Sequence, residues 1–141
     1  MRYVLDSSVA FKSVVLEQDS SKAIRLLEEY RRGLHELIAP DIFPHELAHA
    51  LTRAERQGRL AIGQALAHWT DVMRFPPQFV PCLTLVPRAI GIASSARIGV
   101  YDCDYVALAE RESCEFLTAD TKLARNLQGQ FPFIVLLSSM P

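Results

Sequence analysis

The segment RYVLDSS at residues 2–8 decides the fold class of this chain. Residues 2–5 are a short run of β-prone residues that stops at Asp6, and the two serines that follow are favourable at a helix N-terminus. A similar arrangement returns late in the chain, where residues 115–118 predict a strand that leads into Asp120. Strands that alternate with helices in this way are typical of α/β proteins.

The hydrophobic pattern predicts further elements between and beyond these two segments. Strands are predicted at 35–39, 79–85 and 133–137, and helices at 20–32, 41–57, 62–73, 87–98, 102–113 and 121–127. The stretch IVLL at 134–137 is apolar on both faces, which indicates a parallel sheet covered by helices on both sides. We therefore expect a single three-layer α/β/α sandwich with a central, mainly parallel sheet, and one domain over residues 1–141.

Composition narrows the class of protein further. The chain has 141 residues, of which 50% are hydrophobic and 22% charged, so it is able to bury a core. Its net charge of −1 argues against a protein that holds nucleic acid simply by being basic, but permits a basic surface beside an acidic site. The sequence shows neither a signal peptide nor a membrane span, and its three cysteines form no CxxC pair. We expect reduced thiols in a cytoplasmic protein with no membrane association.

Four acidic residues fall where predicted strands end or where the following helices begin: Asp6, Glu46, Asp102 and Asp120. Ligands of open parallel sheets bind beyond the carboxyl ends of the strands, so these carboxylates are expected to converge. Mg²⁺ and Mn²⁺ prefer such oxygen ligands, and one or two of these ions would polarise a phosphodiester and activate water. Taken singly, each carboxylate is also explained as a helix cap or a solvent-facing charge.

Four segments, in this order, resemble the PIN domain and, more narrowly, the VapC toxins of type II toxin–antitoxin systems. They are VLDSSVA at 4–10, ELAHAL at 46–51, YDCDYVALAE at 101–110 and LTAD at 117–120. The resemblance implies a Mg²⁺- or Mn²⁺-dependent endoribonuclease that cleaves RNA, forms a homodimer and is neutralised by a cognate antitoxin protein. It assigns catalysis and metal binding to the acidic quartet Asp6, Glu46, Asp102 and Asp120, with Ser8 and Thr118 as accessory hydroxyls.

The chain departs from the family pattern at three places. Lys12 is followed by Ser13 where the family often has Trp, and His49 stands where it often has Asn. Asp104 occupies a position at which a small residue is usual. Asp104 is therefore an accessory candidate, which either adds a ligand or points away, since residues two apart on a helix diverge.

Two alternatives from other functional classes remain at this point. HELAH at 45–49 matches the HExxH pattern, in which His45 and His49 would bind zinc and Glu46 would activate water, as in a zinc metalloprotease. The sequence supplies no third zinc ligand in a recognised context. The other alternative is a non-catalytic PIN-like module that binds RNA or a protein; the intact acidic quartet counts against it.

Overall fold

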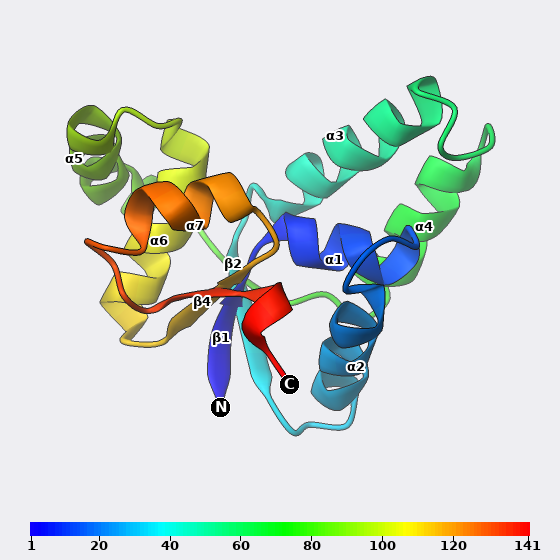
Figure 1. Ribbon diagram of the computed structural model, residues 1–141, viewed down its shortest axis with the longest axis horizontal. Coiled ribbons are helices and arrows are strands. Elements are labelled where there is room, and N and C mark those ends of the chain that lie inside the picture. Colours follow the sequence, from blue (N-terminus) through cyan, green and yellow to red (C-terminus); the bar gives the residue numbers. More distant parts are fainter.

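The computed structural model describes residues 1–141 as a five-stranded sheet flanked by seven α-helices (Figure 1). The strands are β1 (Arg2–Leu5), β2 (Glu36–Pro40), β3 (Gln78–Val80), β4 (Glu115–Thr118) and β5 (Ile134–Leu136). The helices are α1 (Ser7–Val14), α2 (Ser20–Arg31), α3 (Phe43–Arg56), α4 (Gln64–Met73), α5 (Val86–Ala96), α6 (Val100–Glu112) and α7 (Thr121–Leu127). Two 3₁₀ helices complete the chain, η1 (Cys82–Thr84) and η2 (Leu137–Ser139).

The sheet is parallel throughout, with strand order β3-β2-β1-β4-β5. The chain moves outward from β1 to β3 and then returns to β4 on the other side of β1. Because crossovers between parallel strands are right-handed, the helices before this reversal lie on one face of the sheet and the helices after it lie on the other. Figure 1 shows α1–α4 on one side of the sheet and α5–α7 on the other. The expected three-layer α/β/α sandwich is confirmed.

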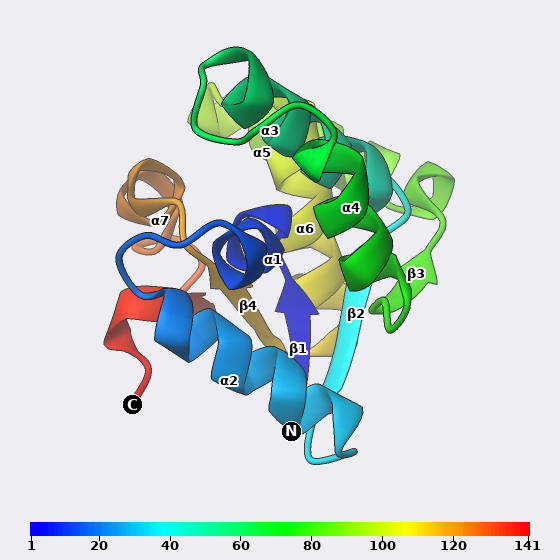
Figure 2. The same cartoon turned by 90° about the vertical axis from the view of Figure 1, so that its right-hand side faces the viewer.

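The two central strands form the middle of the core and lead to the candidate site. Val4 and Leu5 of β1 and Phe116 and Leu117 of β4 are completely buried, because helices cover both faces of the sheet. The chain reverses its direction of travel across the sheet between these two strands. In open α/β sheets ligands bind at the carboxyl ends of the strands at such a point. Figure 2 shows the helices that surround this region.

Helix α3 is fastened to both the core and α4. Its apolar stripe includes Leu47 and Leu51, one turn apart and both completely buried. Near its other end, the Glu55 carboxylate accepts hydrogen bonds from the backbone N–H groups of Gly63 (3.2 Å) and Ala65 (3.0 Å). Glu55 therefore satisfies free N–H groups at the start of α4 and ties the two helices together.

The structure corrects several predicted boundaries. The strand predicted at 79–85 is wrong in extent: β3 ends at Val80, because Pro81 has no N–H to donate to a neighbouring strand, and η1 follows. The helix predicted from residue 62 begins two residues later, after Gly63, whose φ of 92° interrupts a helix.

None of the helices combines the length and the apolar character that a membrane span requires.

Candidate active site

Asp6 lies at the junction of β1 and α1 and is only 7% exposed. Two hydroxyls donate hydrogen bonds to its Oδ2, Thr118 Oγ1 at 2.6 Å and Ser8 Oγ at 2.8 Å. Each hydroxyl also accepts a hydrogen bond from a backbone N–H in the segment after β4. The Asp120 N–H donates to Thr118 Oγ1 and the Ala119 N–H donates to Ser8 Oγ, both at 3.0 Å. Both hydroxyl protons are thus directed at Asp6 Oδ2, which leaves Oδ1 for a ligand.

Glu46 lies in the first turn of α3 and is oriented by a tyrosine from α6. Its Oε1 accepts a 2.6 Å hydrogen bond from the hydroxyl of Tyr105, 59 residues away in the sequence. Tyr105 is completely buried and stacks on Phe116 with ring centroids 5.5 Å apart. No role for Tyr105 was predicted from the sequence, although it lies one helical turn after Asp102 and therefore on the same face of α6.

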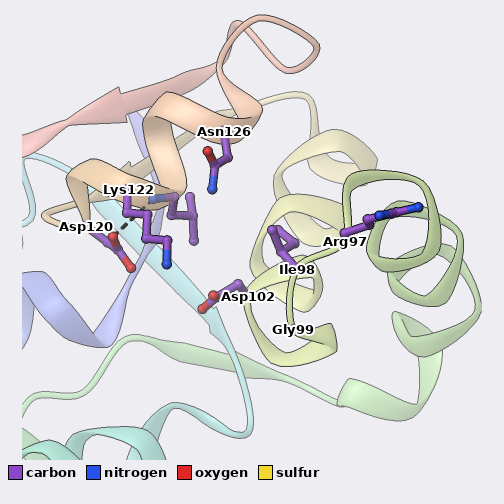
Figure 3. A pocket seen from close by; sticks show the side chains of 8 residues that line it. Arg97, Ile98, Gly99, Asp102, Asp120, Lys122 and Asn126 are labelled. Atoms are coloured by element: carbon purple, nitrogen blue, oxygen red, sulfur yellow. Dashed lines mark hydrogen bonds between the residues drawn. The ribbon is translucent and has the colours of Figure 1, made fainter.

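Asp102 and Asp120 line a common pocket of about 320 Å³. Asp102 lies in the first turn of α6, and Asp120 precedes α7, where its Oδ1 caps the helix by accepting the Leu123 N–H at 3.1 Å. Figure 3 shows Lys122 of α7 extending into the space between the two carboxylates and Asn126, one turn later, directed toward the same pocket, whereas Arg97 points away. Neither Lys122 nor Asn126 was predicted from the sequence, although their four-residue spacing places them on one helix face.

Burial and mutual repulsion raise the pKa values of Asp6, Glu46 and Asp102. Burial raises the pKa of Glu46 to about 7, and Asp6 and Asp102 add to the rise, although the Tyr105 hydrogen bond opposes it. Burial raises the pKa of Asp102 to about 6, and Asp6 and Asp120 contribute. Burial also raises the pKa of Asp6 against its two hydroxyl hydrogen bonds, and Asp120 adds to that rise. The four carboxylates therefore share one electrostatic environment.

This donor set fits a hard divalent cation. All four groups are carboxylates, and burial together with neighbouring negative charge raises the pKa values of Asp6, Glu46 and Asp102; a bound cation would neutralise that charge. No three His, Cys, Asp or Glu side chains are placed to hold an ion by themselves. Mg²⁺ is compatible with this incomplete set, because it usually binds one or two carboxylates and fills its remaining positions with water and substrate phosphate oxygens.

The same geometry does not favour the zinc protease interpretation. A catalytic zinc takes three protein ligands, and no third ligand accompanies His45 and His49. Both histidines are exposed on α3, and the Glu46 carboxylate between them is bound to Tyr105.

Asp104, the accessory candidate, lies apart from the pocket shared by Asp102 and Asp120. It is 3% exposed, and its Oδ1 has no hydrogen-bond partner. Burial raises its pKa, whereas a hydrogen bond with Cys82 lowers it. Because residues two apart on α6 point in different directions, Asp104 faces η1 while Asp102 faces the pocket.

Comparison with known proteins identifies the family to which this chain belongs. The family model of the PIN domain matches residues 3–126, which include all four carboxylates. The chain belongs to the PIN domain family. The resemblance recognised in the four sequence segments is therefore confirmed.

PIN domain proteins similar to this chain include Ribonuclease VapC9 of Mycobacterium tuberculosis. The two are 31% identical over 136 residues, which cover 94% of this chain and 97% of VapC9. The crystal structure of PAE2754 from Pyrobaculum aerophilum has a TM-score of 0.68 at 20% identity, covering 99% of this chain and 94% of that one. The structure of VapBC2 from Rickettsia felis, bound to a DNA fragment from their promoter, has a TM-score of 0.64 at 15% identity. This match covers 96% of this chain and 97% of that chain. These structures share the fold of this PIN domain.

Proposed function

We propose that this PIN domain protein is a Mg²⁺- or Mn²⁺-dependent endoribonuclease and the toxin of a toxin–antitoxin pair. The observation that carries the proposal is that Asp6 and Asp120 follow β1 and β4, where the chain reverses across the sheet, and that the other two carboxylates lie near them. Asp102 lines the same pocket as Asp120, and Glu46 is close enough to Asp6 and Asp102 for their charge to raise its pKa. Relatives that match nearly the whole chain are named VapC ribonucleases, which supports the same activity.

The quartet Asp6, Glu46, Asp102 and Asp120 would hold the cation. When bound, the cation supplies positive charge to the scissile phosphate and lowers the pKa of water. The protein's own contribution is to hold carboxylate oxygens ready. Ser8 and Thr118 orient Asp6, and Tyr105 orients Glu46. No protein nucleophile is required, because water is the attacking group in a hydrolysis of this kind.

The surroundings of the quartet suit a phosphate backbone. Lys122 and Asn126 point into the pocket from α7 and supply N–H donors for phosphate oxygens. Arg53 and Arg56 continue along exposed positions of α3 beyond Glu46. With the four carboxylates set aside, the rest of the chain has a formal charge of +3. RNA binding should therefore weaken as salt rises and should also depend on the cation.

We also propose a homodimer and a cognate antitoxin as partners in the cytoplasm. Large apolar side chains are exposed on two separate surfaces. Ile62 and Leu66, near the α3–α4 connection, are 97% and 70% exposed, and Leu83 of η1 and Ile90 of α5 are 84% and 53% exposed. Apolar surface of this kind commonly marks a protein interface. Light scattering tests the dimer, and a short open reading frame next to this gene supplies the antitoxin candidate for co-purification.

The test of the activity is RNA cleavage by the purified chain with Mg²⁺, with Mn²⁺ and with EDTA. Asp6→Asn should abolish cleavage, because it removes a carboxylate charge while retaining an acceptor for the two hydroxyls. The matched control is Asp71→Asn, which changes an exposed Asp on α4 that pairs only with Arg74. Cleavage that survives both EDTA and Asp6→Asn would refute the proposal. RNA binding without any cleavage in Mg²⁺ or Mn²⁺ would support the non-catalytic module instead.

A further inference from the structure

A second pocket, of about 420 Å³, lies directly beside the carboxylate site. It is lined by Ser7, Ile42, His45, Glu46, His49 and Tyr101. Glu46 belongs both to this pocket and to the acidic quartet, so a molecule bound here would lie next to the reacting phosphate. The volume falls within the range of about 300–1,000 Å³ that is typical of small-ligand sites.

The walls of this pocket offer a flat, partly apolar surface together with unused polar groups. Tyr101 is 57% exposed, and its ring takes part in none of the aromatic pairs of the chain. His45 and His49 are exposed one turn apart on α3, and their imidazoles have no hydrogen-bond partner in the chain. An aromatic face for stacking and free ring nitrogens for hydrogen bonds are the groups that recognise an unpaired nucleobase.

The charge beyond the pocket favours RNA over a protein segment as its occupant. Glu46, His49, Arg53 and Arg56 follow one another at spacings of three, four and three residues, and so lie along one face of α3. None of the chain's ion pairs involves Arg53 or Arg56, which leaves both guanidinium groups free to bind phosphates. A strand that crosses the quartet and continues along this face would place one base in the pocket.

We infer that the pocket formed by His45, His49, Tyr101 and Ile42 binds the nucleobase adjoining the cleaved bond and sets the base preference of the enzyme. This inference rests on the proposed ribonuclease function. It also gives a role to the two histidines of the HExxH pattern, which the metal site does not use.

The first experiment measures base preference by sequencing the products of partial cleavage of a randomised oligoribonucleotide pool. The native chain should prefer one base at one position beside the cut. His49→Ala and Tyr101→Ala should each reduce that preference by about 10-fold, the factor expected from the loss of one stacking or hydrogen-bonding partner. Tyr101→Phe should retain the preference because it keeps the ring, and His68→Ala on α4 is the matched histidine control. Unchanged base preference in both alanine variants would overturn the inference.

The second experiment does not depend on cleavage. The imidazole signals of the four histidines are followed by NMR as adenosine, guanosine, cytidine or uridine is added at millimolar concentration. The preferred nucleoside should move the signals of His45 and His49, but not those of His35 and His68, and Tyr101→Ala should weaken that response. A chain that binds a nucleoside here but cleaves no RNA would refute the proposed function and the role of the pocket in base preference, while supporting the pocket as a nucleobase site. A chain that cleaves RNA without base preference, and whose histidine signals respond to no nucleoside, would refute the pocket assignment alone.

Discussion

Replacing Glu46 by Gln should remove the pH dependence of stability that this carboxyl imposes. In the folded chain burial raises the pKa of Glu46 from 4.5 to about 7, so the folded state keeps a proton that the unfolded chain releases over this interval. Because the unfolded state then binds fewer protons, the free energy of unfolding falls as pH rises from about 4.5 to about 7. The contribution is fully present below pH 4.5 and lost above pH 7.

The size of this effect follows from the same interval. Each pH unit between the two pKa values is worth about 1.4 kcal/mol, so full ionisation would cost the folded state about 3 kcal/mol. Glu46 is only partly buried, and screening by water reduces the expected cost to about 2 kcal/mol. Gln carries no charge and keeps an oxygen for the Tyr105 hydroxyl, so Glu46→Gln should be more stable than the native chain by that amount at pH 8.

Urea unfolding in EDTA at pH 4, 5, 6, 7 and 8 measures this difference. The two proteins should differ by less than about 0.5 kcal/mol at pH 4 and should diverge as pH rises. Asp102 contributes to the pH dependence of both proteins, so the difference between them reports Glu46 together with its coupling to Asp102. Glu28→Gln is the matched control, because Glu28 is exposed on α2 and forms no side-chain hydrogen bond or ion pair. Parallel curves for the native chain and Glu46→Gln would refute the reasoning.

Three further predictions concern the same site. At pH 8, Mg²⁺ should raise the melting temperature of the native chain because it binds only the folded site. Asp120→Asn should remove that rise and should itself raise the melting temperature in EDTA. If neither Mg²⁺ nor the substitution changes the melting temperature, the carboxylates do not cluster. Thr118→Val removes a donor to Asp6 and the acceptor of the Asp120 N–H, so urea unfolding should show a loss of about 1–3 kcal/mol, and an unchanged value would contradict the network. Tyr105→Phe removes a hydrogen bond that lowers the pKa of Glu46, so carboxyl NMR titration in EDTA should show that pKa rising further; a lower or constant value would count against the assigned bond.

The net charge of −1 gives no indication that the charges are unevenly distributed over the protein. The quartet gathers negative charge at one edge of the sheet, while Lys122 points into the pocket and Arg53 and Arg56 extend along α3. Net charge measures only the sum, whereas RNA responds to the local field. Composition alone could therefore not show that the acidic quartet lies beside the basic residues Lys122, Arg53 and Arg56.

The sequence by itself determined the α/β class and the convergence of Asp6 and Asp120. Both follow from local information: short apolar runs predict parallel strands, and the carboxyl ends of parallel strands meet at one edge of a sheet. Strand extent was less secure, since the run 79–85 is apolar enough for a strand but Pro81 ends β3 at Val80.

The family resemblance predicted Ser8 and Thr118 as accessory hydroxyls, but only the tertiary structure decided which carboxylate each hydroxyl contacts and added Tyr105. The hydroxyl of Tyr105 reaches Glu46 across 59 residues, and that of Thr118 reaches Asp6 across 112. Such pairs depend on strand order and on the rotation of each helix about its axis, which are set by packing of the whole core. The same packing turned Asp104 toward η1 and opened the pocket beside His49, because periodicity assigns a residue to a face but does not say what lies opposite that face.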